Sequence, residues 1–283
     1  MKKFILIIIL FCSIIPVSAT RNTFILWQLP SQVNTIGNSY IILSRNGKVV
    51  VIDGGVDKET SYLRGFLAAL GNEVEAWFVS HPHADHIGAL TEILKSPQGI
   101  VIKKVYHSEF SPSFRSSEGV GAAAVANAYY DAIAASGISV TNYTTPGAQI
   151  VIDGVNFKIL TVANENILVN TYNNSSMVFR VWDKKKSILF LGDLGLEAGD
   201  LLLNSPYRKD LDCDYLQMAH HGQAGVSRDF YRTIRFSVCL WPTPSWVYNN
   251  DNGNLKTLET RAWMQELGIT EHYISYQGLC KIE

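Results

Sequence analysis

Short apolar runs separated by glycine, asparagine or aspartate dominate the pattern of this chain. The runs 40–43 and 49–52 flank Asn46-Gly47, a strong signal for a β-hairpin. Runs 150–152 and 157–161 flank Asp153-Gly154, and runs 177–182 and 187–191 flank a lysine-rich turn. Each of these three pairs predicts two antiparallel strands.

Strands and helices are predicted to follow each hairpin region. Further strands are expected over 76–79, 215–218 and 236–240, and helices over 60–70, 122–135, 196–203, 227–234 and 255–267. Residues 108–120 predict a loop. Residues 241–248 contain two prolines, which exclude a central strand and predict a rigid aromatic loop. Together the pattern predicts an α/β chain with two mixed sheets packed together and helices outside.

The first 19 residues predict a targeting segment rather than part of the fold. Two lysines precede an apolar run, and Val17-Ser18-Ala19 supplies small residues for cleavage. The order is typical of a secretory signal peptide cut after Ala19, since the run is short for a membrane-spanning helix. We therefore expect residues 20–283 to form one exported domain, secreted or periplasmic, with no membrane segment after cleavage.

Composition narrows the function classes. The chain has 283 residues, 47% hydrophobic and 17% charged, which excludes disorder. Its formal net charge is −1, and losing Lys2 and Lys3 with the signal would lower it to −3. Such a chain lacks the basic surplus of a general nucleic-acid binder, so no stable nucleic-acid binding is expected. Four cysteines are too few for a disulfide scaffold; Cys239 is expected in the core, while Cys213 and Cys280 could pair.

Three imidazoles and a carboxylate follow the strand 76–79 within six residues: His81, His83, Asp85 and His86. Imidazole nitrogen and carboxylate oxygen are ligands of Zn²⁺. A loop at the strand end can direct His81 and His83 to one ion, with Asp85 and His86 facing a second position. The density of these residue types predicts a metal site rather than core packing.

With this His-x-His-x-Asp-His pattern, the chain resembles the metallo-β-lactamase superfamily. The resemblance implies a four-layer αββα sandwich over nearly the whole exported chain. It implies that Asp53 supports the ligands by hydrogen bonds, that Asp193 bridges two metals, and that one of His220 and His221 ligates the second metal. We assign the ligand to His221, because Gly222 leaves room for close approach, and expect His220 to face the substrate; the reverse assignment is the alternative.

One histidine of that family pattern is missing. The family usually places it about 20 residues before the bridging Asp, where this chain has Asn173 and Asn174 followed by two serines. This asparagine-rich segment and the late His-His-Gly resemble the hydrolase domain of ComEC/Rec2-type DNA-uptake proteins. An asparagine oxygen could complete the first site, so Mn²⁺ is as acceptable as Zn²⁺, with one or two ions bound.

Two other histidines are candidates of lower weight. His107 is expected either to line the pocket or to lie on the surface, and His272 is expected to be structural. The aromatic loop 241–248 is interpreted either as a stacking platform for a ligand or as a plug over the core.

These features predict a secreted metal-dependent hydrolase with Asp85 and His220 as catalytic residues. Metal-activated hydroxide would attack phosphorus or a carbonyl carbon, and His220 would protonate the leaving group. A phosphodiester or other small molecule is the expected substrate. The alternatives are an acyl hydrolase of the β-lactamase or lactonase type, and a non-catalytic metal-binding module.

Overall fold

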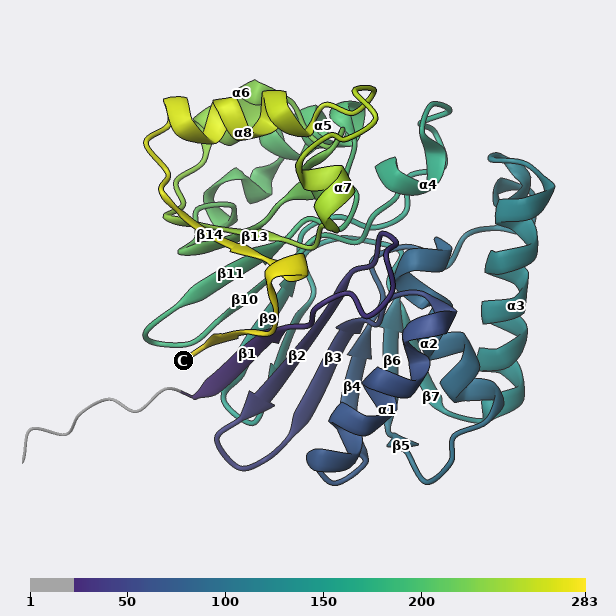
Figure 1. The fold of residues 1–283 in the computed structure, drawn as a ribbon. Helices are drawn as coiled ribbons and strands as arrows, with labels where there is room; N and C mark the ends of the chain where they lie inside the picture. The colour runs from purple at the N-terminus through teal and green to yellow at the C-terminus, as the bar shows by residue number, and fades with distance from the viewer. Residues whose placement is uncertain (1–22) are drawn as a thin grey trace, which may run out of the picture.

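The computed structural model describes residues 23–283, and within them two β-sheets pack face to face (Figure 1). The expected signal peptide and its cleavage after Ala19 lie outside the described residues. The first sheet has the strand order β15 (Cys280–Ile282), β1 (Phe24–Gln28), β2 (Ser39–Ser44), β3 (Val49–Asp53), β4 (Glu73–Phe78), β6 (Lys104–His107) and β7 (Ser139–Asn142), with β5 (Val101–Ile102) also pairing with β4. The second sheet has the order β14 (Glu271–Ile274), β13 (Val238–Trp241), β12 (Tyr215–Gln217), β11 (Ser187–Phe190), β10 (Phe179–Trp182), β9 (Val155–Ile159) and β8 (Gln149–Ile152).

Helices cover the outer face of each sheet. The α-helices are α1 (Thr60–Ala69), α2 (Ala84–Lys95), α3 (Val120–Ser136), α4 (Thr171–Asn174), α5 (Leu196–Leu203), α6 (Arg228–Thr233), α7 (Ser245–Tyr248) and α8 (Thr257–Glu266). Five 3₁₀ segments connect them: η1 (Asp57–Glu59), η2 (Phe114–Ser116), η3 (Pro206–Asp210), η4 (Ala219–Gly222) and η5 (Ser275–Gln277). Helices α1, α2 and α3 lie on the first sheet, and α5, α6 and α8 lie on the second (Figure 1).

Strand β3 shows why the central strands appear in the sequence as continuous apolar runs: both of its faces are buried. Successive side chains point to opposite faces, so Val50 and Ile52 enter the core between the sheets while Val49 and Val51 pack under the helices. In β11 of the second sheet, Ile188 and Phe190 enter the core between the sheets, while Leu189 packs under the helices on the other face. The resulting three apolar layers confirm the predicted four-layer αββα sandwich.

Parallel pairing brings the functional segments to one edge. Strand β3 pairs parallel with β4, and β11 pairs parallel with β12, so the carboxyl ends of each pair lie together. The backbone N–H of Met177 donates to the carbonyl of Ser80 over 2.7 Å, which ties the end of the first sheet to the second. Ligands of open α/β sheets are typically held at such strand ends.

The predicted hairpins and helices are present. In the His-x-His-x-Asp-His segment, the first half is a loop and the second half begins a helix. Helix α2 begins at Ala84, so Asp85 and His86 lie in its first turn. Ile87, Leu90 and Leu94 recur at helical spacing and are buried, which explains the helix. The expected loop therefore holds for His81 and His83, whereas Asp85 and His86 are presented by a helix.

Two further expectations change. Residues 241–248 are not one loop: Trp241 ends β13 and is fully buried, and α7 follows. This excludes Trp241 as a stacking platform and favours the plug interpretation for it.

Cys213 and Cys280 are free thiols rather than a pair. Within the described part of the chain, no helix has the length and apolar character needed to cross a membrane.

Candidate metal centre

Asp53, at the end of β3, organises the ligand loop. Its carboxylate accepts hydrogen bonds from Asn38 Nδ2 over 2.6 Å, from the Ser80 backbone N–H over 2.7 Å and from His86 Nδ1 over 2.8 Å. Because His86 donates through Nδ1, its Nε2 is the nitrogen that remains to face a metal ion. Orientation of a metal-binding imidazole by a carboxylate in this way is a common arrangement.

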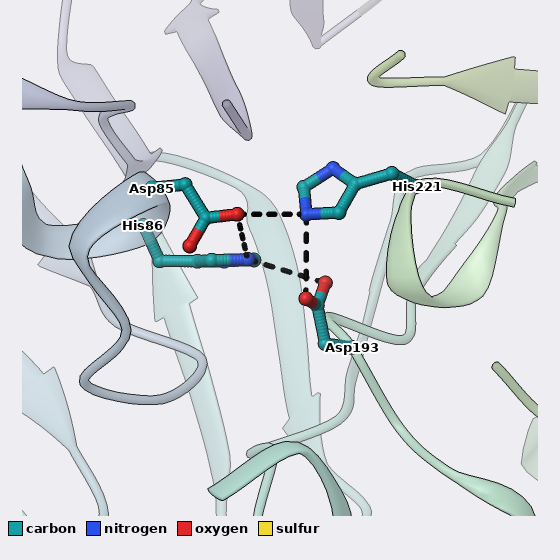
Figure 2. A group of neighbouring side chains, drawn as sticks. All are labelled: Asp85, His86, Asp193 and His221. Atoms are coloured by element: carbon teal, nitrogen blue, oxygen red, sulfur yellow. Dashed lines mark ion pairs between the residues drawn. The ribbon is translucent and has the colours of Figure 1, made fainter. Parts of the chain in front are cut away.

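Asp85, His86, Asp193 and His221 converge on one point; we call them the four-residue cluster (Figure 2). His221 Nε2 lies 3.0 Å from Asp85 Oδ2 and 3.3 Å from Asp193 Oδ2. His86 Nε2 lies 3.2 Å from Asp193 Oδ1 and 3.8 Å from Asp85 Oδ2. Four tetrahedral ligands of Zn²⁺, each about 2.0–2.1 Å from the ion, would lie roughly 3.3 Å apart. The spacing therefore fits a divalent ion.

Asp193 also belongs to a three-residue cluster with His81 and His83. His81 Nε2 lies 2.9 Å from His83 Nδ1 and 3.9 Å from Asp193 Oδ2. The shared carboxylate follows β11, whereas the histidines follow β4. Asp193 therefore has the geometry of a bridge between two metal positions.

Unpartnered polar atoms support the fit. His86 Nε2, His221 Nε2 and Asp193 Oδ1 are buried, and although they lie near one another, none of them has a hydrogen-bond partner within the described residues. Buried polar atoms are almost always paired, so an ion is the natural partner for three that face one another. These residues fit one or two divalent ions.

The charges of the protein itself also favour a bound cation at the four-residue cluster. Burial opposes charging of His86, but Asp193, Asp53 and Asp85 around it raise its pKa well above the ordinary value. Burial likewise opposes charging of His221, and the carboxylates of Asp193 and Asp85 raise its pKa to about 9. The carboxylates thus create a strongly negative pocket that stabilises cations.

His220 and His221 occupy different positions although they are adjacent. Both adopt left-handed backbone conformations, with φ of 48° and 55°. His221 is fully buried and donates from Nδ1 to the Pro242 carbonyl over 2.8 Å, which leaves Nε2 for the cluster. His220 lies outside both clusters, with Nε2 3.8 Å from Asp193 Oδ2.

The reason for the glycine after His221 differs from the one expected. A Cβ at Gly222 would lie 2.3 Å from the Trp241 indole. Gly222 makes room for a buried ring rather than for close approach of backbone and metal.

Asn173 and Asn174 have separate roles. Asn174 accepts from the backbone N–H of Ala198 and donates to Val169 and Glu197, so it braces the start of α5 and does not face the clusters. Asn173 lies 3.5 Å from His220 Nε2 through Nδ2, and its Oδ1 is buried without a partner. Of the two, Asn173 is the one that contacts a histidine beside the clusters.

The remaining histidines lie elsewhere. His107 is neither at the pocket nor on the surface: it is buried and lies 3.0 Å from the hydroxyl of Tyr129. Burial lowers its pKa to about 4, so it is a neutral core residue. His272 contacts Trp241 Nε1 over 3.1 Å, in agreement with a structural role.

Sequence reasoning missed two groups beside the ligands. Ser80 Oγ lies 3.1 Å from both His81 Nδ1 and His86 Nδ1, and its place directly before His81 could have indicated this. Glu118 lies 2.7 Å from His83 Nε2. Glu118 sits in a loop 35 residues away, and no local motif marks it.

Comparison with known proteins adds a family and a fold. The model of the metallo-beta-lactamase superfamily matches residues 34–236. No curated protein sequence matches the chain.

Several solved structures share the fold. The metallo-beta-lactamase fold protein YhfI from Bacillus subtilis is 11% identical, with a TM-score of 0.55 over 92% of this chain and 99% of that one. A metallo hydrolase from the archaeon Ignicoccus hospitalis is 13% identical, with a TM-score of 0.54 over 92% and 99%. CmlA, a diiron beta-hydroxylase from Streptomyces venezuelae, is 11% identical, with a TM-score of 0.57 over 93% of this chain and 55% of that one. At these identities the likeness concerns the fold alone.

Proposed function

The chain belongs to the metallo-beta-lactamase superfamily, and from this premise we propose that it is a metal-dependent hydrolase that cleaves a phosphodiester. The observation that carries the proposal is Asp193, whose carboxylate is common to both candidate ligand clusters. Divalent ions held in such sites act as Lewis acids and provide a hydroxide nucleophile near neutral pH.

The residues of the chain divide the remaining work. Asp53 fixes His86, and the Pro242 carbonyl fixes His221, so both imidazoles present Nε2. His220 lies beside Asp193 and is more accessible than His221, with its side chain 21% exposed. Its position suits a contact with the substrate and transfer of a proton to the leaving group. Asp85 is also partly accessible, with its side chain 25% exposed.

A phosphodiester is favoured over an acyl substrate because the three-residue cluster has only two imidazoles. The segment with Asn173 takes the place of another histidine and offers an oxygen instead. This segment and the late His-His-Gly resemble the hydrolase domain of ComEC/Rec2-type proteins. The resemblance also supports a phosphodiester substrate. Oxygen-rich ligation is compatible with Mn²⁺ as well as Zn²⁺. We further propose that the protein acts outside the cytoplasm, because its first 19 residues are typical of a signal peptide.

A substrate panel tests the proposal. Residues 20–283, stripped and then loaded with Mn²⁺ or Zn²⁺, are assayed with bis-p-nitrophenyl phosphate, nitrocefin and single-stranded DNA. Turnover of the phosphodiester supports the proposal, whereas turnover of nitrocefin alone favours an acyl hydrolase. Metal binding without turnover of any substrate would favour a non-catalytic module.

Metal content provides the structural arm of this test. Asp193→Ala is expected to lose more bound metal than His81→Ala or His221→Ala, because it removes a ligand from both clusters. His272→Gln, which changes a histidine that belongs to neither cluster, is the control and should keep its metal. Equal metal content in the three site variants would contradict the bridging role.

A further inference from the structure

Glu118 connects the three-residue cluster to a second segment of the chain. It lies just before α3, and its side chain is 23% exposed. Its Oε2 is 2.7 Å from His83 Nε2. A carboxylate is only an acceptor, so His83 donates the Nε2 proton, and in the neutral imidazole the lone pair is then on Nδ1. That Nδ1 is the atom 2.9 Å from His81 Nε2.

The other oxygen of Glu118 holds α4. Glu118 Oε1 accepts from the backbone N–H of Tyr172 over 2.8 Å and from Thr171 Oγ1 over 3.2 Å. The carboxylate thus spans from the ligand loop to the segment that carries Asn173. Both of its oxygens are occupied, so its orientation is fixed from two sides.

Tyr172 reinforces the arrangement. Its ring stacks on the His83 imidazole, with centroids 5.1 Å apart and planes inclined by 25°. Tyr172 is fully buried, and its hydroxyl donates to the Arg115 carbonyl. His83 is therefore held in its plane by a hydrogen bond at one edge and by a ring against its face.

We propose that Glu118 and Tyr172 are positioning residues that lock His83 in the Nε2–H tautomer and present its Nδ1 to a metal ion beside His81. The inference rests on the proposed metal function. A cluster with only two imidazoles depends strongly on each being preset, because every ligand that must be reoriented weakens binding. Loss of such supporting partners typically costs 10–100-fold in metal affinity. The α4 segment contributes to the cluster by holding His83 in place.

The test combines tautomer and metal measurements on Glu118→Ala. Long-range ¹H–¹⁵N NMR of the metal-free wild type should show His83 as the Nε2–H tautomer, and Glu118→Ala should lose this preference. In Mn²⁺ and Zn²⁺ titrations, affinity at the three-residue cluster should fall about 10–100-fold. Binding at the four-residue cluster should be unchanged.

Glu109→Ala is the matched control, because Glu109 lies on the same loop and pairs with Arg115, and within residues 23–283 it forms no hydrogen bond or ion pair with an imidazole. Tyr172→Phe should behave as wild type, whereas Tyr172→Leu should weaken the same metal position as Glu118→Ala. Thermal melting verifies that each variant folds.

An unchanged tautomer, or equal affinity of wild type and Glu118→Ala at both clusters, would overturn the inference. Because the tautomer is measured without metal, it decides the role of Glu118 even if the wild type binds no ion. Absence of metal binding by the wild type would refute the proposed function separately.

Discussion

At the scale of single residues, backbone conformation separates the roles of His220 and His221. Three consecutive residues, ending at Gly222 with φ of 78°, take the left-handed conformation. Non-glycine residues adopt it at an energetic cost, and such strain concentrates at functional sites. Here it turns one imidazole into the four-residue cluster and leaves the other beside it.

This separation predicts different results for the two histidines. His221→Ala should lose metal and activity together, because it removes a fully buried cluster nitrogen. His220→Ala should keep metal and fold while turnover of a small phosphodiester falls about 10²–10⁴-fold, as expected for an acid–base contribution. Metal analysis and steady-state kinetics measure both effects. Retention of metal by His221→Ala with loss in His220→Ala would reverse the assignment.

Glu59 is a buried acid outside the clusters. It ends η1, and its Oε1 accepts from the backbone N–H of Gln32 over 2.9 Å. Burial raises its pKa from 4.5 to about 7, although backbone N–H groups of Gln32, Val33 and Val56 oppose the shift. The folded state therefore binds the Glu59 proton more tightly than the unfolded state does.

The shift predicts a pH dependence of stability. A raised folded-state pKa contributes stability below pH 4.5 that is lost as pH rises through about 7. Relative to Glu59→Gln, the wild type should lose about 2–3 kcal/mol of unfolding free energy between pH 5 and pH 8. Urea denaturation of both proteins at several pH values measures this difference. Parallel stability curves for the two would show that Glu59 does not titrate in this range.

At the scale of elements, η4 is locked against β13. Gly222 packs directly over the Trp241 indole, and Trp241 is fully buried in the core under α5, α6 and α8. The segment carrying His221 is thus fixed by the strand beside it.

Gly222→Ala should therefore destabilise the protein by about 2–4 kcal/mol, from the left-handed backbone and the clash with the ring. Gly268→Ala is the matched control, since Gly268 has φ of 73° but open space around its Cβ position. It should cost only about 1 kcal/mol. Denaturation midpoints compare the two. A cost for Gly222→Ala no larger than that of the control would show that the packing on Trp241 is unimportant.

The elements also show what sequence pattern can predict. The hairpin around Gly47 and the helix Leu196–Leu203 were predictable, because their apolar spacing and turn residues are local. The local His-x-His-x-Asp-His motif likewise indicated the metal-type residues. Glu118 and the separate roles of Asn173 and Asn174 were not predictable, since they depend on contacts between distant segments. The two positions expected for His107 were wrong for the same reason, because its partner Tyr129 lies on α3.

At the scale of the whole molecule, the candidate centre joins the two sheets. His81, His83, Asp85 and His86 follow β4 of the first sheet, while Asp193 and His221 follow strands of the second. Figure 2 shows Asp85 and His86 facing Asp193 and His221. Three apolar layers hold the sheets in place, so the ligands are brought together by the fold rather than by one flexible loop. Rigid placement of this kind is what a preorganised hydrolytic site requires.

We propose that this centre hydrolyses a phosphodiester only when metal is bound. The most direct test measures turnover of bis-p-nitrophenyl phosphate by the stripped protein as Mn²⁺ or Zn²⁺ is added stepwise. We predict no turnover without metal and a rise that saturates at one or two ions per chain. Turnover that is equal with and without metal, or no turnover after the ions have bound, would contradict the claim.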